Sequence, residues 1–99
     1  MSVYVDSLFP TPSKCNWRFS HACHIFADNE DELHAFVASI GLRRAWFQNH
    51  PRLPHYDMTK TKRLLAVKLG AIEVSARFTG QWMRERQPDP TQNRQSRPV

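Results

Sequence analysis

Residues 28–41 have the sequence DNEDELHAFVASIG and contain the strongest helix signal in the chain. Asn29 can cap the N-terminus, and Glu32, three positions later, completes a capping box. The apolar residues that follow recur at the spacing of one buried helix face: Leu33, Phe36, Val37 and Ile40. Gly41 provides the C-terminal stop. We therefore predict a helix from about Asn29 to Ile40.

The segments on either side of this helix have the composition of strands. Residues 3–5 are β-branched and aromatic, which predicts a short strand ending at Asp6. Residues 17–27 are partly apolar on both alternating faces, as expected for an interior strand covered on two sides. After the helix, residues 42–48 are predicted to form a short strand, and residues 49–54, with two prolines, a loop.

The C-terminal half repeats this order of elements. Leucines, alanine and valine between Leu64 and Leu69 predict a second helix that ends at Gly70, and residues 71–78 alternate as in a strand with one buried face. We therefore predict one α/β domain over residues 1–80, with a mixed sheet of about four strands and two main helices. Residues 81–99 are basic and contain proline, which predicts a flexible tail.

Composition narrows the class of protein. The chain has 99 residues and a net charge of +5, so one domain with an anionic partner (nucleic acid, a nucleotide or an acidic protein) is expected, although solubility alone explains the charge equally well. Two cysteines are too few for a disulfide scaffold, and no apolar run approaches the roughly 18 residues that span a bilayer. With no signal peptide at the N-terminus, we expect a cytoplasmic protein without membrane contact.

Residues 55–63, with the sequence HYDMTKTKR, concentrate chemically active side chains. If this segment is extended, His55 and Asp57 project to the same face, about 7 Å apart along the chain. That arrangement suits two ligands of one ion, or an acid and a base on either side of a substrate. Alternatively, Asp57 caps the helix that follows or forms an Asx-turn.

The second predicted helix begins with an unusual number of cations. Lys60, Lys62 and Arg63 oppose the helix dipole, whereas an anion bound there would be attracted by the dipole, the free N–H groups and the cations together. We therefore predict a phosphate site that also includes Thr59. The competing interpretation is that these long side chains simply extend into water.

Histidines and aspartates elsewhere are candidates for the same site. His24 and Asp28 share one face of the second strand, and Asp6 ends the first; parallel strands would bring the two aspartates into one crevice, and antiparallel strands would separate them. The predicted metal ligands are Asp6, Asp28, His24 and Asp57, for a divalent cation, and the predicted acid–base residues are His55, Asp57, His34 and His24. A zinc site at His21–His24 with Cys15 is disfavoured because strand alternation separates its donors and CxxC spacing is missing.

Several short motifs occur here in one order: VYVD at 3–6, ELHAF at 32–36, IG at 40–41, WFQ at 46–48 and HYD at 55–57. In this combination, residues 2–74 resemble a family of short bacterial and phage proteins classed as a domain of unknown function. The resemblance implies no activity. It implies that certain polar positions belong to the family pattern, namely Asp6, His24, Asp28, Glu32, His34, Gln48, His55, Tyr56 and Asp57.

Together these features support two classes of function. The first is a small His/Asp site, metal-dependent and hydrolase-like, acting on a phosphate-containing or nucleic-acid substrate. The second is a non-enzymatic phage or bacterial accessory protein that binds nucleic acid or a host protein, which the charge, the basic tail and the small size favour. A purely structural polar network is the third interpretation, and whether the protein is an enzyme stays open at this point.

Overall fold

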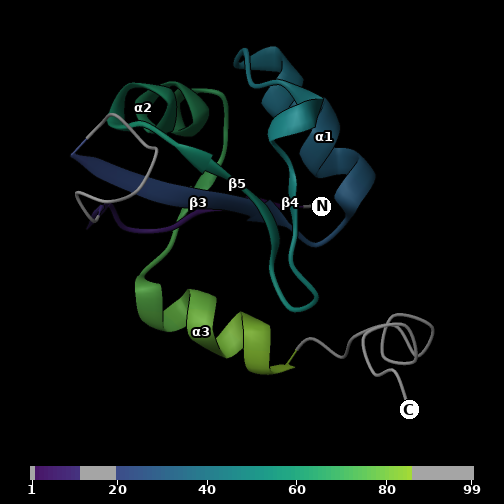
Figure 1. The fold of residues 1–99 in the computed structure, drawn as a ribbon, viewed down its shortest axis with the longest axis vertical. Helices are drawn as coiled ribbons and strands as arrows, with labels where there is room; N and C mark the ends of the chain where they lie inside the picture. Colours follow the sequence, from purple (N-terminus) through teal and green to yellow (C-terminus); the bar gives the residue numbers. More distant parts are fainter. Residues whose placement is uncertain (1, 12–19, 86–99) are drawn as a thin grey trace.

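A six-stranded mixed sheet forms the centre of the structure, a computed structural model that describes residues 2–11 and 20–85 (Figure 1). The strands are β1 (Val3–Val5), β2 (Phe9–Pro10), β3 (His21–Ala27), β4 (Gln48–Asn49), β5 (Pro54–Met58) and β6 (Ile72–Glu73). Their order is β4-β5-β3-β1-β6, and β2 pairs with β3. All pairs are antiparallel except β1 with β6. The long strand β3 therefore lies in the middle of the sheet, between β5 and β1.

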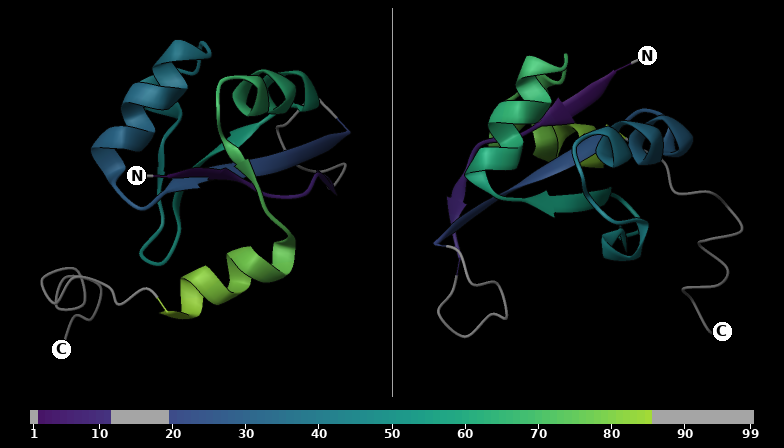
Figure 2. Two further views of the ribbon diagram at one scale, coloured as in Figure 1. Left: turned by 180° about the vertical axis from the view of Figure 1, so that it is seen from behind. Right: turned by 90° about the horizontal axis from the view of Figure 1, so that it is seen from above.

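Helices cover both faces of this sheet. Figures 1 and 2 show α1 (Glu30–Ser39) and α2 (Lys60–Lys68) on one side and α3 (Ala76–Glu85) on the other. A short 3₁₀ helix, Arg44–Trp46, follows α1. No helix in the described ranges is long and apolar enough to cross a membrane.

The main hydrophobic core lies between the sheet and the pair α1 and α2. Strand alternation sends one set of side chains there, and the helices contribute their apolar stripes. This core includes Val5, Cys23, Ile25, Tyr56 and Met58 from the strands, with Leu33, Val37 and Ala66 from the helices. On the other face, α3 packs by aromatic contacts, Phe78 on Tyr4 and Trp82 on Phe26, with ring centroids 5.3 and 4.9 Å apart. Both faces of β3 are thus covered, as predicted.

The ends of α1 follow the sequence prediction closely. Asn29 caps the helix, its Oδ1 accepting from the Glu32 N–H at 3.0 Å. Gly41 has a φ of +85°, which favours glycine, and a Cβ there would lie 2.9 Å from Lys62 Nζ. That ammonium donates to the Ile40 carbonyl at 2.7 Å. The Lys62 ammonium of α2 therefore interacts favourably with the negative, C-terminal end of the α1 dipole.

Two predictions in the middle of the chain are wrong in part. Residues 42–48 form no continuous strand, because the 3₁₀ helix intervenes and β4 begins only at Gln48. The aromatic residues Trp46 and Phe47, which suggested a strand, instead have separate environments: Trp46 is exposed, and Phe47 packs on Tyr56. The predicted loop over residues 49–54 is shorter than expected, because Asn49 belongs to β4 and Pro54 begins β5, which pairs with β3 and β4 on its two sides.

The predicted strand over residues 71–78 is also wrong in most of its length. Only Ile72 and Glu73 pair with β1, and α3 begins at Ala76. Ser75 caps the N-terminus of this helix, since its Oγ accepts from the Phe78 N–H at 3.1 Å. α3 continues across residue 80, the boundary expected for the tail, and residues 86–99 lie outside the described ranges. The predicted single α/β domain with a mixed sheet is confirmed, with a third helix added.

Candidate metal site

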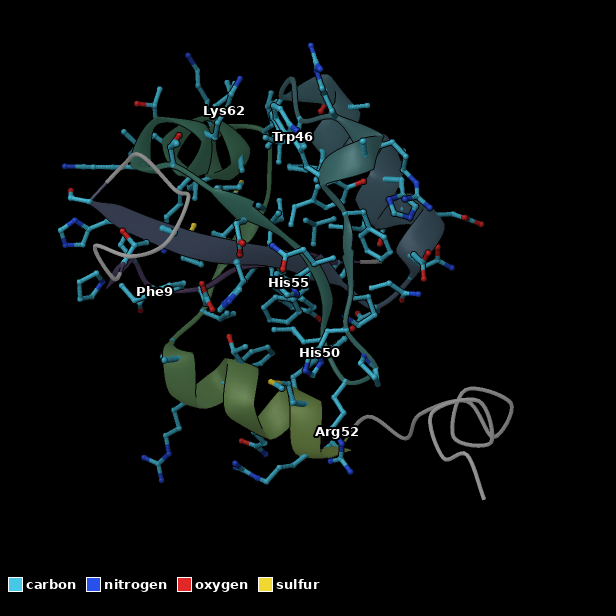
Figure 3. The ribbon with its side chains drawn as sticks, viewed as in Figure 1. Phe9, Trp46, His50, Arg52, His55 and Lys62 are labelled. Carbon is cyan, nitrogen blue, oxygen red and sulfur yellow. The ribbon has the colours of Figure 1, made fainter. Side chains whose placement is uncertain are left out.

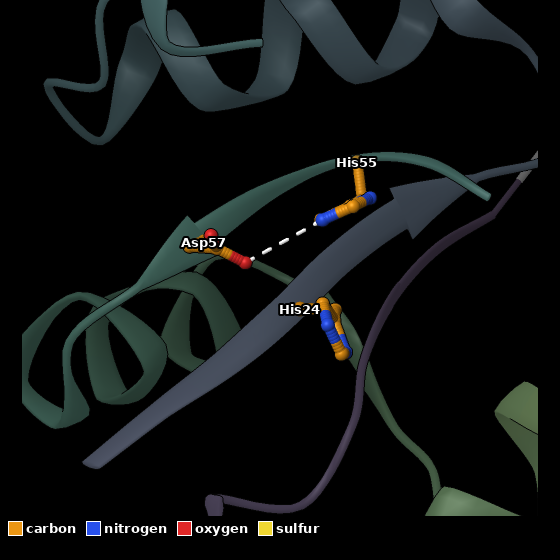
Figure 4. A group of neighbouring side chains, drawn as sticks. All are labelled: His24, His55 and Asp57. Atoms are coloured by element: carbon orange, nitrogen blue, oxygen red, sulfur yellow. Dashed lines mark ion pairs between the residues drawn. The ribbon is translucent and has the colours of Figure 1, made fainter. Parts of the chain in front are cut away.

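Three side chains that could bind a metal ion meet on the α3 side of the sheet, the face opposite the main core (Figure 4). His24 on β3 pairs directly with Asp57 on β5, so both point to the same face, and His55 lies two positions earlier on β5. Each residue offers one ligand atom, and these three atoms lie within 4.8 Å of one another. The structure therefore brings together three of the side chains singled out in the sequence.

Asp6 fixes the orientation of His24 by hydrogen bonds to its backbone N–H and to its ring Nδ1. Its Oδ1 accepts from the His24 backbone N–H at 2.7 Å, and its Oδ2 accepts from Nδ1 of the ring at 2.6 Å. Burial lowers the pKa of His24, but the hydrogen bond to Asp6 and the charges of Asp6 and Asp57 outweigh this and raise the pKa above its ordinary value. With Nδ1–H donated to Asp6, the neutral ring carries its lone pair on Nε2.

His55 is held in the same tautomer by the backbone. Its Nδ1 lies 2.5 Å from the Leu53 carbonyl, which can only accept, so Nδ1 must donate. The ring stands edge-on to that of His24, with centroids 4.7 Å apart. Nε2 faces Asp57 Oδ1 at 3.5 Å. A neutral His55 therefore places a lone pair opposite a carboxylate oxygen.

Asp57 is prepared to be an anion. Burial raises the pKa of its carboxyl. The hydrogen bond with His55, the charge of His55 and the hydrogen bond from the Gln48 amide together outweigh burial and hold this pKa below its usual range. Gln48 Nε2 donates to Oδ2, which leaves Oδ1 on the side of His55. The site thus combines two oriented imidazoles with one ionised carboxylate.

Asp28 and His34, also predicted as site residues, lie elsewhere. β1 and β3 are antiparallel, so Asp28 is separated from Asp6, and it accepts instead from Tyr4 Oη at 3.0 Å and Trp82 Nε1 at 3.2 Å. These bonds connect β1 and α3 to the residue that precedes the Asn29 cap of α1. His34 lies within 2.8 Å of Tyr56 Oη and 3.2 Å of Glu30 Oε1. Because Tyr56 belongs to the core face, His34 is on the opposite side of the sheet from His24.

The cations at the start of α2 are mostly engaged within the chain. Thr59 is the N-cap, its Oγ1 accepting from the Lys62 N–H at 3.2 Å, so Asp57 is not needed for this role. Lys62 binds the end of α1, as described above. Arg63 donates to the Asp6 carbonyl at 2.8 Å and to Glu73 Oε1 at 3.0 Å. Lys60 is exposed. The predicted phosphate site therefore has two of its three cations bound to the chain's own oxygens.

Two groups of the site were absent from the predicted set of ligands and acid–base residues. The Gln48 amide and the Leu53 carbonyl orient Asp57 and His55, and both come from the β4–β5 hairpin. The pairing of Gln48 with His55 in that hairpin is the signal that could have revealed them. Cys23 points to the core, where burial raises the pKa of its thiol to about 12, so it offers no ligand beside His24. Cys15 lies outside the described residues.

Comparison with known proteins agrees with the expected kind of family. A family model described as "Protein of unknown function (DUF4031)" matches residues 3–86, which extends the resemblance beyond residue 74. No curated protein and no solved structure matches the chain.

Proposed function

The chain belongs to the DUF4031 family of proteins of unknown function, and we propose for it a divalent-metal site formed by His24, His55 and Asp57. One observation carries the proposal: His55 Nε2 and Asp57 Oδ1 face each other at 3.5 Å, while Nδ1 of the same ring is committed to the Leu53 carbonyl. With a proton on Nε2 the two atoms form an ion pair, whereas without it they are two acceptors, and a divalent cation would take the place of that proton. A cation satisfies both, and the adjacent His24 supplies a third ligand.

The donor set favours a transition metal. Two imidazoles and one carboxylate occur at catalytic zinc sites and at non-haem iron sites, whereas magnesium and calcium prefer oxygen ligands. Zinc bonds of about 2.0–2.2 Å place tetrahedral ligand atoms roughly 3.4 Å apart, close to the observed separation of His55 Nε2 and Asp57 Oδ1. Ligating histidines usually donate their other N–H to a carboxylate or a carbonyl. Asp6 and Leu53 have these positions here.

The reaction class that this site suits is metal-assisted hydrolysis of a phosphate ester. Three protein ligands leave a coordination position for water, and a metal of this kind lowers the pKa of that water towards neutrality. The net charge of +5 favours a phosphate-containing substrate over a neutral one. His24, oriented by Asp6, and His55, oriented by Leu53, hold their positions without rearrangement. A non-catalytic metal site in a binding protein is the alternative.

Calorimetry on metal-stripped protein tests the metal proposal. We expect Zn²⁺ or Mn²⁺ to bind in a 1:1 ratio, and Asp57→Asn and His55→Gln to weaken binding by about 100-fold or more, because each removes one of only three ligands. The matched controls are His21→Gln and Asp31→Asn, which change exposed residues of the same types outside the site and should bind as the wild type does. Absence of binding by the wild type, or equal binding by Asp57→Asn, would exclude the site.

Hydrolysis is tested separately on the loaded protein. We expect metal-dependent cleavage of bis(p-nitrophenyl) phosphate or p-nitrophenyl phosphate that is lost on adding chelator and in Asp57→Asn. If the metal binds as expected but neither ester is cleaved, and single-stranded DNA and RNA are also left intact, the hydrolytic part of the proposal is wrong and the metal stabilises a binding protein.

A further inference from the structure

The segment between α1 and β5 has a distinctive charge. No acidic residue occurs between Glu32 and Asp57, whereas residues 43–53 contain three arginines, one histidine and two aromatic residues. We call residues 43–53 the basic arm. It comprises the 3₁₀ helix, β4 and the turn that leads to β5. The nearest acidic residues are Asp57 of the candidate metal site on the C-terminal side and, on the N-terminal side, the carboxylates at the first turn of α1.

The arginines of the basic arm have no carboxylate partner among the described residues. Arg43 lies over the ring of Trp46, 5.7 Å from its centroid, and Arg44 lies over Phe47 at 4.9 Å. Arg52 is exposed at the hairpin turn. Arg63, by contrast, is paired with Glu73. The arm therefore presents positive charge that the described part of the chain does not neutralise.

Trp46 is the arm's exposed aromatic surface. Half of its surface, 51 %, is accessible to solvent, although most tryptophans in a small domain are buried. Its neighbour Phe47 is anchored against His34 and Tyr56, with ring centroids 4.6 and 5.5 Å away. The arm thus holds an exposed indole and a cation together on a support that packs against the sheet and α1.

His50 adds an oriented donor at the other end of the arm. Its Nδ1 accepts from the backbone N–H groups of Arg52 and Leu53, at 3.1 and 3.2 Å. An acceptor Nδ1 requires the ring proton on Nε2, and the residue is exposed. His50 therefore offers a fixed N–H to solvent in the same turn that carries the exposed Arg52, and both groups are donors suited to phosphate oxygens.

The same arm forms part of the candidate metal site. Gln48 donates to Asp57, and the Leu53 carbonyl holds His55. In the view of Figure 3, His55 lies between Trp46 at one end of the arm and His50 and Arg52 at the other. We propose that the basic arm binds single-stranded nucleic acid, with Trp46 stacking on a base and Arg44, His50 and Arg52 contacting phosphates. This deepens the proposed function by naming the polymer as the substrate class, and in that respect it rests on the metal site.

The chemistry of the arm favours a nucleic acid over an acidic protein. Arginines beside an exposed aromatic ring can stack on bases as well as neutralise phosphates, and stacking tolerates every base sequence. Carboxylates of an acidic peptide would use the charges but not the indole face. A single strand is specified because bases in a duplex keep their faces stacked on one another.

Binding is tested without metal, so that it does not depend on the catalytic proposal. The full-length chain is titrated, in EDTA, against a fluorescein-labelled 12-mer of dT at several salt concentrations, with fluorescence anisotropy as the readout. We expect Trp46→Ala to weaken binding by roughly 5- to 150-fold through loss of one stacked base. Arg44→Gln and Arg52→Gln should each reduce the slope of log affinity against log salt by about 0.7.

Controls separate the arm from charge in general. Arg77→Gln removes the same charge from an exposed position on α3 and should change the affinity for the 12-mer less than twofold. Asp57→Asn should bind the 12-mer at least as tightly as the wild type, so a failed metal site leaves this result intact. The inference is overturned if the wild type does not bind, if Trp46→Ala binds equally, if polyglutamate of similar length competes equally, or if deleting residues 86–99 alone abolishes binding.

Discussion

The two faces of the β3–β5 pair have opposite chemistry, although the same two strands supply both. One face is the apolar core, with Cys23, Ile25, Tyr56 and Met58 fully buried. The other carries His24, His55 and Asp57, of which His55 is buried and the other two are partly exposed, and their ligand atoms lie within reach of one ion. Because side chains alternate along a strand, stability and chemistry are assigned to different residues of the same segment. Substitutions on one face should therefore leave the property of the other face unchanged.

Asp6 connects the two faces of the sheet. Its side chain accepts from His24 and, at 3.5 Å, from Thr79 of α3, while its backbone carbonyl accepts from Arg63 of α2. Asp6 thus joins the site to both layers of helices. It is the position at which a substitution should affect metal affinity and stability together.

The largest effect is expected on the core face. Ile25→Ala should lower the free energy of unfolding by about 2–5 kcal/mol, because a fully buried side chain is removed and its cavity remains. Urea unfolding in EDTA measures this, and calorimetry of the folded variant should give a zinc affinity within about twofold of the wild type, because Ile25 points to the face of β3 opposite His24. A large loss of zinc affinity in folded Ile25→Ala would show that the two faces are not separate.

A smaller effect is expected for Asp6→Asn. Losing the charge behind His24 should weaken zinc binding by about 10–100-fold, since the carboxylate orients the ring rather than binding the ion. Calorimetry of Asp6→Asn beside Asp57→Asn provides the comparison. A loss as large as that of Asp57→Asn would make Asp6 a direct ligand, and no loss would remove its positioning role.

The smallest effect is a dependence of stability on pH. The pKa of His24 is raised in the folded state, so the folded protein binds this proton more tightly than the unfolded chain does. The resulting stabilisation is complete below about pH 6.5, the ordinary pKa of histidine, and is lost as the pH rises through the folded value. In EDTA, the stability advantage of the wild type over Asp6→Asn should therefore shrink between pH 5.5 and 8.5. An advantage that grows with pH would contradict the assignment.

Local signals predicted α1 well, and tertiary pairing explains what they missed. The Asn29 cap, the apolar stripe and Gly41 all act within one helix, so the sequence contains the complete determinant. The segment around His55 is a strand only because β3 and β4 flank it, and no property of its own residues specifies those partners. The alternation in residues 71–78 predicted a strand, but Phe78 belongs with Trp82, four residues later, to the helical stripe by which α3 packs on the sheet.

The candidate site depended on the same missing information. Once the strand is known, the spacing of His55 and Asp57 correctly predicts that they share a face. The antiparallel direction of β1 and β3 places Asp6 beside His24 and leaves Asp28 at the other end of the strand pair. The supporting roles of Gln48 and Leu53 follow from the register of the β4–β5 hairpin. The residue types indicated which side chains could bind a metal ion, and the strand pairing determines which of these side chains lie close together.

The position of the proposed ligands on two strands would have a consequence for folding. His24 and the pair His55 and Asp57 are far apart in the chain and meet only when β3 and β5 have paired. The unfolded chain offers an ion no comparable set, so binding favours the folded state by mass action. A bound ion would add a reversible cross-link between β3 and β5, the two strands that enclose α1 and the basic arm, and would oppose their separation.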